Sequence, residues 1–204
     1  MADLLETGAE GVSLRGEDWY AEEIGAVRFA DCVFTDVDLT EVTSRGTTFE
    51  GCTFHSCKLN ASTHHATAFV GCDFRRSNFF TATLDGCKLT GSVFADCVMR
   101  PLTVTGGAWV GVSLRGHDLT GLDLRGVDLR DADLSMSDLT GAMLAEARLD
   151  GAAVRETNLS RADLRRASLD RVDLTSATLK ETRIDLAAAV LLAELHGAVV
   201  DVGE

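Results

Sequence analysis

Six cysteines are the residues that most directly suggest chemistry, because thiolates bind zinc, form disulfides and act as nucleophiles. No two of them have the paired C-x-x-C spacing of a zinc site. The spacings are all multiples of five, which places the six at one recurring position: Cys32, Cys52, Cys57, Cys72, Cys87 and Cys97. A free cysteine at such a position acts as a small buried hydrophobe. We therefore expect free thiols, no metal ion and no cofactor.

Ser44 and His64 suggest a second chemistry, because a serine beside a histidine is half of a nucleophilic pair. They are twenty residues apart. The sequence shows neither a third group to orient the histidine nor a donor for an oxyanion. We interpret the pair as a buried Ser–His hydrogen bond, or as a local bulge that turns both side chains outward. The sequence predicts no enzyme.

Aspartates form the third candidate set, and they recur in steps of five: Asp118, Asp123, Asp128, Asp133, Asp138, Asp163 and Asp173. A carboxylate cluster can perform acid–base catalysis. Here, however, arginines alternate with the aspartates and would lower their pKa values, which suits them poorly to acid catalysis. An aspartate at a corner of the chain can also bond the neighbouring backbone. Part of this series is therefore structural.

All three sets share one five-residue frame. Leucine occupies every fifth position from Leu114 to Leu149, and the frame runs from residue 14 to residue 184 without an insertion. It contains 35 positions, of which 33 are apolar, and Ser44 and His64 are the two exceptions. A period of five matches neither a helix nor a strand, so it indicates a repeat. We name the apolar residue of each unit the central residue, and the small residue two places earlier the filler.

Columns of like residues indicate how the repeat winds. Residues twenty apart match in two sets: Phe34, Phe54, Phe74 and Phe94, and Phe29, Phe49 and Phe69. Four five-residue sides therefore close one coil, and the coils stack at strand spacing. Nearly nine coils give a rod of roughly 40 Å at about 4.8 Å per coil. Cys32, Cys52 and Cys72 are expected in one column with parallel side chains, too poorly oriented for a disulfide.

Two units, residues 132–136 (ADLSM) and 162–166 (ADLRR), resemble the A(D/N)LXX consensus of the pentapeptide-repeat family. The resemblance covers nearly the whole chain and implies an all-β fold, the right-handed quadrilateral β-helix. A narrower resemblance is to the mycobacterial fluoroquinolone-resistance branch of this family. It rests on residues 91–94 (GSVF), Cys97, residues 100–103 (RPLT) and a tail with Asp185, Ala189, Val190, Ala193, His196 and Gly197. That branch lacks the loops that interrupt the rod in the Qnr relatives, and the unbroken frame agrees.

The narrower resemblance implies a non-enzymatic DNA mimic that binds DNA gyrase or topoisomerase IV. Such a protein inhibits the enzyme, or gives resistance to fluoroquinolones or another gyrase poison. A formal net charge of −13 counts against nucleic acid as a direct partner but suits a basic protein surface. A 40 Å length of duplex DNA carries roughly 24 negative charges, so the protein carries about half the charge of the DNA that it would mimic. The expected gyrase contacts are acidic: Asp31, Asp36, Asp38, Asp118, Asp123, Asp128, Asp133 and Asp138.

Charge is distributed unevenly along the frame. Residues 1–50 contain twelve acidic and three basic residues, a net charge of −9. Residues 112–185 contain fourteen acidic and eleven basic residues, a net charge of only −3. The N-terminal end therefore carries most of the acidic excess, which serves either binding or solubility.

The middle of the chain departs from the regular pattern. Phe80 follows the central residue Phe79 and is expected to be exposed, which would matter if Val70 and Val110 lay nearby. Pro101 is the only proline and removes a backbone donor from the ladder, which predicts a bend in the rod. Gly107 occupies a filler position before Trp109, and its missing side chain is expected to make room for the indole.

The two ends are expected to differ from the repeats at 12–185. Residues 1–11 form a leader or N-terminal cap. In residues 186–204, Asp185 and Gly197 bracket a short C-terminal α-helix over 186–196. This helix is apolar nearly all round, so it either caps the rod or forms a homodimer. The expected dimer residues are Leu186, Val190, Leu191, Leu192, Leu195, Val199 and Val200.

The sequence predicts a cytoplasmic protein without a membrane segment. The start of the chain has no basic region followed by a long apolar run, and the longest apolar run, residues 186–193, is too short to span a bilayer. Two other functions stay open. One is a repeat scaffold or self-resistance (immunity) protein with an unrelated protein partner. The other, which ranks last, is a β-helix enzyme with a carboxylate cluster on one outer face.

Overall fold

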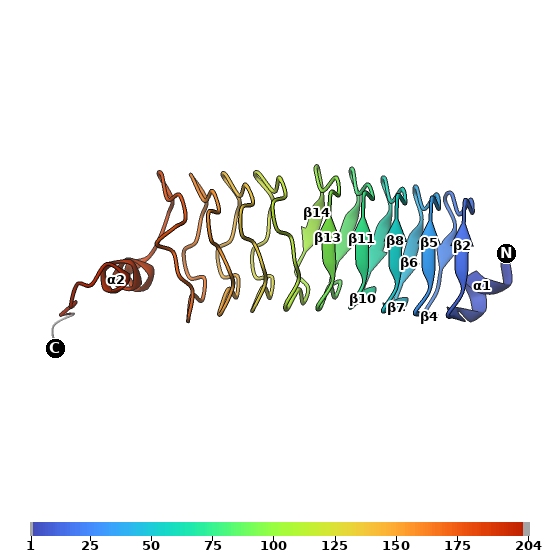
Figure 1. Ribbon diagram of the computed structural model, residues 1–204, viewed down its shortest axis with the longest axis horizontal. Helices are drawn as coiled ribbons and strands as arrows, with labels where there is room; N and C mark the ends of the chain where they lie inside the picture. Colours follow the sequence, from blue (N-terminus) through green and yellow to red (C-terminus); the bar gives the residue numbers. More distant parts are fainter. Residues whose placement is uncertain (1, 202–204) are drawn as a thin grey trace.

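The computed structural model describes residues 2–201, which form one column of stacked coils between two short helices (Figure 1). The helices are α1 (Ala2–Thr7) and α2 (Leu186–Leu195). The strands, mostly three residues long, are β1 (Ala9–Glu10), β2 (Ser13–Arg15), β3 (Glu23–Ile24), β4 (Arg28–Ala30), β5 (Val33–Thr35), β6 (Thr43–Arg45), β7 (Thr48–Glu50), β8 (Thr53–His55), β9 (Thr63–His65), β10 (Ala68–Val70), β11 (Asp73–Arg75), β12 (Thr83–Asp85), β13 (Val93–Ala95) and β14 (Thr103–Thr105).

Three parallel sheets and one row of isolated bridges make the four sides of the column. In chain order, face A holds β1-β4-β7-β10, face B holds β2-β5-β8-β11-β13, and face D holds β3-β6-β9-β12-β14. Face C lies between faces B and D, and its coils are joined by single bridges such as Asp18↔Asp38 and Asn78↔Val98. Every pairing joins residues twenty apart, for example Phe34↔Phe54. The chain is therefore the right-handed quadrilateral β-helix that the sequence predicts.

Beyond Thr105 the coils continue without regular strands. Isolated parallel bridges, again twenty residues apart, carry the ladder from Ala108↔Asp128 to Asp163↔Arg183. The four faces continue through this part, so central residues twenty apart still lie on the same face. At the N-terminal end the ladder begins at Ala9, which pairs with Phe29, and Leu5 of α1 is buried against the first coil.

The core consists of the central residues and fillers. Rings of successive coils stack on face B, where Phe54 lies 4.6 Å from both Phe34 and Phe74 between ring centroids. All six cysteines are free, and all but Cys97 are fully buried. Their thiols donate to backbone carbonyls twenty-three residues earlier, as Cys57 does to Phe34. The predicted structural role of the cysteines as fillers is confirmed.

Ser44 and His64 form the buried hydrogen bond expected from the sequence. Ser44 Oγ lies 2.6 Å from His64 Nδ1 and 2.6 Å from Thr67 Oγ1. His64 Nε2 lies 3.0 Å from Ser62 Oγ, which in turn donates to the Leu59 carbonyl. Burial lowers the pKa of His64 to about 4. A histidine whose two ring nitrogens both have partners and whose ring is enclosed serves packing rather than catalysis.

Gly107 makes room for an indole, as predicted. A Cβ at Gly107 would lie 2.4 Å from the Cys87 carbonyl oxygen and 3.1 Å from Trp109 Nε1, and its φ is +118°. Nearby, the Arg100–Pro101 peptide bond is cis, and the Pro101 carbonyl accepts a hydrogen bond from the Thr81 amide. The ladder keeps its register here, since Leu84 pairs with Val104. The bend at Pro101 stays a prediction.

Helix α2 begins at the predicted residue, Leu186, and ends at Leu195, one residue before the predicted end. The Asp185 side chain accepts a hydrogen bond from the Ala188 amide, and Gly197 follows the helix with φ of +82°. Ala188 is buried, whereas Leu186 is 75% exposed. Figure 1 shows α2 beyond the last coil rather than folded across it. None of the helices in residues 2–201 is both long and apolar enough to cross a bilayer.

Candidate protein-binding surface

The five aspartates predicted in the C-terminal coils do not form one acidic face. They precede successive central residues, so they point outward from successive sides of the column. Asp118 and Asp138 share face C and pair directly through a bridge. Asp123, Asp128 and Asp133 lie on faces D, A and B. The structure therefore brings together only two of the five.

These aspartates have a structural role, as expected. The Asp118 carboxylate accepts from the Thr120 amide at 3.1 Å, and the Asp138 carboxylate accepts from the Thr140 amide at 2.9 Å. The same bond, from the amide two residues later, recurs at Asp123, Asp128, Asp133 and Asp163. Each carboxylate thus satisfies a backbone donor at its own corner.

Arginines neutralise most of the acidic series on faces A and D. On face D, Arg125 binds Asp123 at 2.6 Å and Arg165 binds Asp163 at 2.6 Å. On face A, Asp128 pairs with Arg130 at 2.7 Å and with Arg148 at 3.4 Å. The hydrogen bonds from Arg165 lower the pKa of Asp163 to about 2. These carboxylates are ionised, but each has its counter-ion within the chain.

The predicted acidic residues of the N-terminal coils are less fully paired. Asp31 and Asp36 are exposed corner residues with φ of about +50°, on faces A and B. They form no ion pair with a residue in the range 2–201. Asp38 lies on face C and pairs with Lys58 at 2.9 Å. The acidic excess of this end is therefore open to an external partner.

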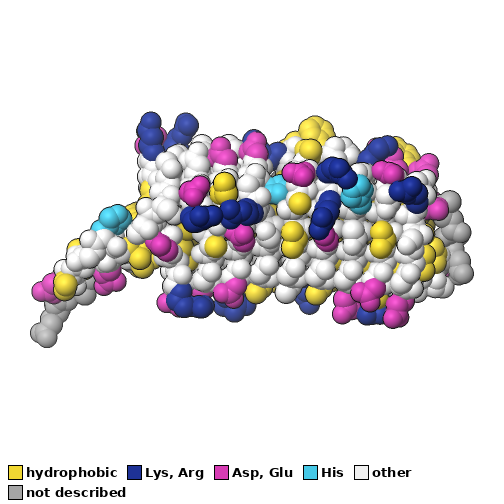
Figure 2. All heavy atoms as spheres, viewed as in Figure 1, with side chains coloured by type: hydrophobic (Ala, Val, Ile, Leu, Met, Phe, Trp, Pro, Cys, Tyr) yellow, Lys and Arg dark blue, Asp and Glu magenta, His cyan; other side chains and the backbone are white. Residues whose placement is uncertain are grey.

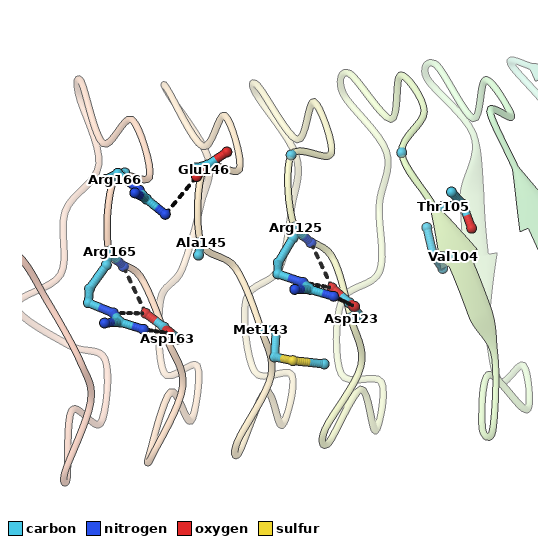
Figure 3. A pocket seen from close by; sticks show the side chains of 12 residues that line it. Val104, Thr105, Asp123, Arg125, Met143, Ala145, Glu146, Asp163, Arg165 and Arg166 are labelled. Carbon is cyan, nitrogen blue, oxygen red and sulfur yellow. Dashed lines mark hydrogen bonds and ion pairs between the residues drawn. The ribbon is translucent and has the colours of Figure 1, made fainter.

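A shallow depression of about 600 Å³ lies on face D (Figure 3). Its floor contains Met143, and the ion pairs Asp123–Arg125, Asp163–Arg165 and Glu146–Arg166 surround it. All three carboxylates are held by arginines, so none is poised as an acid or base. Within residues 2–201, no three histidine, cysteine or acidic side chains gather closely enough to hold a metal ion.

Face C presents apolar side chains as well as acidic ones. Phe80 is exposed, as predicted, and Val98 on the next coil of the same face is exposed as well. Val70 and Val110 lie on face A, on the opposite side, so they do not extend this patch. Tyr20, which is not among the residues expected to be exposed, is exposed on the same face. Its position directly after the central residue Trp19 is the signal that would have indicated it.

Figure 2 shows acidic and basic side chains interspersed over the visible side of the column. At the C-terminal end, a pocket of about 230 Å³ lies between the last coil and α2, with Leu169, Ala188 and Leu191 in its wall. The expected dimer residues Val190, Leu191, Leu192 and Leu195 are half-buried in a single chain, and Val199 is almost fully exposed. Val200 is half-buried.

The unbroken five-residue frame and the four-sided column define a repeat protein of the pentapeptide class. The sequence matches the pentapeptide repeats family in eight copies over residues 65–96, 110–144 and 142–181. The chain belongs to this family.

One curated relative is the pentapeptide repeat protein MfpA of Mycobacterium tuberculosis (strain ATCC 25618 / H37Rv). It is 37% identical over 97 residues, which cover 45% of this chain and 53% of MfpA. The match thus spans about half the length of that relative. Among solved structures, the fold is similar to trypsin-treated QnrB1, a plasmid-mediated fluoroquinolone resistance protein. The TM-score is 0.79 at 22% identity, over 94% of this chain and 99% of that one. Full-length QnrB1 gives a TM-score of 0.66 at 20% identity, over 93% and 99%.

Proposed function

We propose that this protein is a non-enzymatic partner of DNA gyrase, or of topoisomerase IV, which it binds as a mimic of duplex DNA. Binding inhibits the enzyme, protects it from a fluoroquinolone or another poison, or does both. The observation that carries the proposal is an acidic column of uninterrupted coils in a chain 37% identical to MfpA over 97 residues. The column has the elongated shape of a duplex, and its charge of −13 suits a basic, DNA-binding protein surface.

The distribution of ion pairs supports a stronger mimicry of DNA charge in the N-terminal coils than in the C-terminal coils. The arginine pairs of the C-terminal coils leave few free carboxylates there, whereas Asp31 and Asp36 are exposed without an internal partner. Duplex DNA carries one charge per about 1.7 Å, which a single chain does not match. Specific contacts must therefore add to the general electrostatic attraction.

We also propose that two chains associate through the C-terminal end. Leu186 and Val199 are strongly exposed apolar side chains, and an exposed apolar patch on a small protein marks an interaction site. A twofold dimer buries the same patch on both chains. It also doubles the length of the acidic column. Because gyrase acts on the chromosome, this function places the protein in the cytoplasm.

The first experiment is a supercoiling assay with purified gyrase. Wild-type protein is expected to inhibit supercoiling at micromolar concentration, and a parallel assay with a fluoroquinolone scores cleaved DNA. If the protein inhibits supercoiling but does not reduce the amount of DNA cleaved in the presence of the drug, it is an inhibitor. If the amount of cleaved DNA falls, the protein protects gyrase from the drug. No inhibition and no protection at micromolar protein would reject the proposal. A scaffold or self-resistance protein with an unrelated partner would then be favoured.

The dimer is tested by changing one exposed residue of α2. Leu186→Glu is expected to halve the mass measured by light scattering, because it places two charges in an apolar contact. Val33→Glu on face B changes an exposed apolar residue in the same way and is expected to leave the mass unchanged. A wild-type protein that is monomeric at micromolar concentration would contradict the dimer.

A further inference from the structure

The exposed aromatic side chains of this protein share one face. Both tryptophans and eight of the nine phenylalanines are central residues buried in the core. The remaining phenylalanine, Phe80, is 48% exposed, and the single tyrosine, Tyr20, is 54% exposed. Both directly follow a central residue of face C, three coils apart, which corresponds to about 14 Å.

The fold does not require an aromatic ring at either position. Other members of the same row are polar: Thr40, Asn60, Arg100, Thr120, Thr140, Ser160 and Lys180. Where the side chain two places earlier is Asp or Asn, it accepts a hydrogen bond from the amide of this residue, as at Thr40 and Thr120. The Phe80 amide donates to Asn78 Oδ1 and the Tyr20 amide to Asp18 Oδ1. This backbone hydrogen bond therefore does not depend on an aromatic ring, although the Tyr20 hydroxyl also interacts with Glu41.

Phe80 belongs to an apolar patch near the middle of face C. Val98 is 47% exposed and lies on the next coil, where it forms a backbone bridge with Asn78, two residues before Phe80. Arg100 and Asp118 border the patch and bind each other, with both carboxylate oxygens 2.9 Å from Arg100 Nη1. Aromatic residues, aliphatic neighbours and arginine at a charged rim are the composition of protein–protein interfaces.

Carboxylates lie on both sides of this patch along the same face. Asp18 and Asp38 precede it along the column, and Asp118 and Asp138 follow it. Asp18 and Asp138 form no ion pair with any residue of the described range, although backbone amides hold both in place. A partner that supplies cations to these two groups, and an apolar depression between them, would complement face C.

We infer that face C is the surface that contacts the topoisomerase, with Phe80 and Val98 as a central apolar anchor and Tyr20 as a second. This inference rests on the proposed function and adds the face and the anchor residues to it. The partner surface is the basic, DNA-binding surface of the enzyme. On faces A and D, Arg130 and Arg125 neutralise Asp128 and Asp123. Face C also has two paired aspartates, Asp38 and Asp118, but its Asp18 and Asp138 form no ion pair within residues 2–201.

The test compares two matched double variants in the gyrase supercoiling assay. Phe80→Ser/Val98→Ser removes the anchor on face C. Val33→Ser/Val93→Ser removes two exposed valines on face B, of which Val93 is 43% exposed. The face C variant is expected to raise the concentration for half-inhibition at least about tenfold, as for a central interface residue. The face B variant is expected to stay within about twofold. Circular dichroism and melting temperature verify that both variants fold.

Tyr20→Ser provides a second measurement at the other anchor, with an expected weakening of about fivefold. If wild type inhibits gyrase but the face C variants inhibit equally well, the inference is wrong while the proposed function stands. Equal losses on faces B and C would also overturn it, because the contact would not be specific to one face. If wild type neither binds nor inhibits the enzyme, the proposed function itself fails.

Discussion

Two regions of the column use the same frame with different side chains. The coils up to residue 105 have short strands, phenylalanine columns and fillers that are mostly cysteine, valine, serine or threonine. The coils from residue 112 to residue 185 have isolated bridges, leucine columns and mostly small aliphatic fillers. The residues twenty apart pair in both regions. The spacing of the central residues therefore determines the fold, whereas the residues beside them determine whether the local backbone forms a strand or an isolated bridge.

The residue before the central one distinguishes the two regions. Seven threonines occupy this position. Thr178 forms only an isolated bridge, and the other six lie in strands: Thr43, Thr48, Thr53, Thr63, Thr83 and Thr103. A β-branched side chain favours the extended backbone. In the C-terminal coils an aspartate there bonds the amide two residues later and favours a turn, as Asp123 does with Arg125. Asp73, which lies in β11, is an exception. Up to residue 105, face C has no threonine at this position, and it too lacks regular strands. Its residues there are Asp18, Asp38, Lys58, Asn78 and Val98.

The largest expected effect comes from the cores of the two regions. Phe54 and Leu134 are fully buried central residues of face B, one in each region. Phe54→Ala is expected to lower the free energy of unfolding by about 5 kcal/mol, and Leu134→Ala by about 3 kcal/mol. Phe54 loses stacking on both neighbours, which adds to the cavity. Denaturant unfolding measures both, and a larger loss for Leu134→Ala would contradict the assigned role of the stack.

The junction between the regions is expected to be nearly as sensitive. Gly107→Ala places a Cβ 2.4 Å from the Cys87 carbonyl oxygen, so we expect a loss of about 3 kcal/mol in unfolding free energy. Gly106→Ala is the control, since its φ is +60° and nothing lies within 4 Å of the added Cβ. The control is expected to lose about 1 kcal/mol from the left-handed backbone alone. Equal losses would show that Gly107 is needed for its φ and not for space.

Between pH 4 and pH 7, a pH effect on stability is expected from His64, which lies in the N-terminal region. The folded-state pKa is lowered from 6.5 to about 4 by burial, so the unfolded chain takes up a proton first as the pH falls. The stability contribution is complete above pH 6.5 and is lost progressively down to about pH 4. The loss is about 3 kcal/mol over this range.

His64→Leu keeps an apolar central residue and is expected to remove this part of the pH dependence. Unfolding free energies of the wild type and the variant, measured between pH 4 and pH 7, give the difference. Parallel pH profiles for the two proteins would show that His64 is not buried as a neutral ring. Acidic groups common to both proteins cancel in this comparison.

Much of the fold can be predicted from the sequence because the central residues repeat without a gap. The frame predicts the four faces, the phenylalanine columns, the cysteine fillers and the Ser44–His64 bond. It also predicts the space at Gly107. Strands in one region and bridges in the other do not follow from the frame, since they depend on the balance of threonine and aspartate beside each central residue.

The candidate site is less well predicted. The aspartates at steps of five read as one ladder in the sequence, yet a step of five turns the chain to the next face. Only a step of twenty returns to the same face, as from Asp118 to Asp138. The ion pair of Asp118 with Arg100 joins residues eighteen apart, so spacing alone did not reveal it. Tyr20 directly follows a central residue, as Phe80 does, so its exposure could have been predicted by the same argument.

The smallest expected effect comes from surface charge, because fewer of the predicted acidic residues form ion pairs in the N-terminal coils than in the C-terminal coils. Asp31→Asn/Asp36→Asn removes two exposed, unpaired carboxylates from the N-terminal coils. Asparagine tolerates their positive φ, so the column is expected to keep its stability. The affinity for gyrase is expected to fall about threefold at low ionic strength and less at high salt, because exposed charges are screened.

Arg125→Gln/Arg165→Gln makes the opposite change in the C-terminal coils, where it unmasks Asp123 and Asp163. Each exposed pair contributes about 0.5 kcal/mol or less to stability, so the variant is expected to fold normally. If attraction depends on free negative charge, its affinity for gyrase rises at low salt or stays constant. A fall as large as that of the N-terminal variant would mean that these ion pairs themselves contact the enzyme. The C-terminal coils would then be part of the binding surface rather than a neutral support for it.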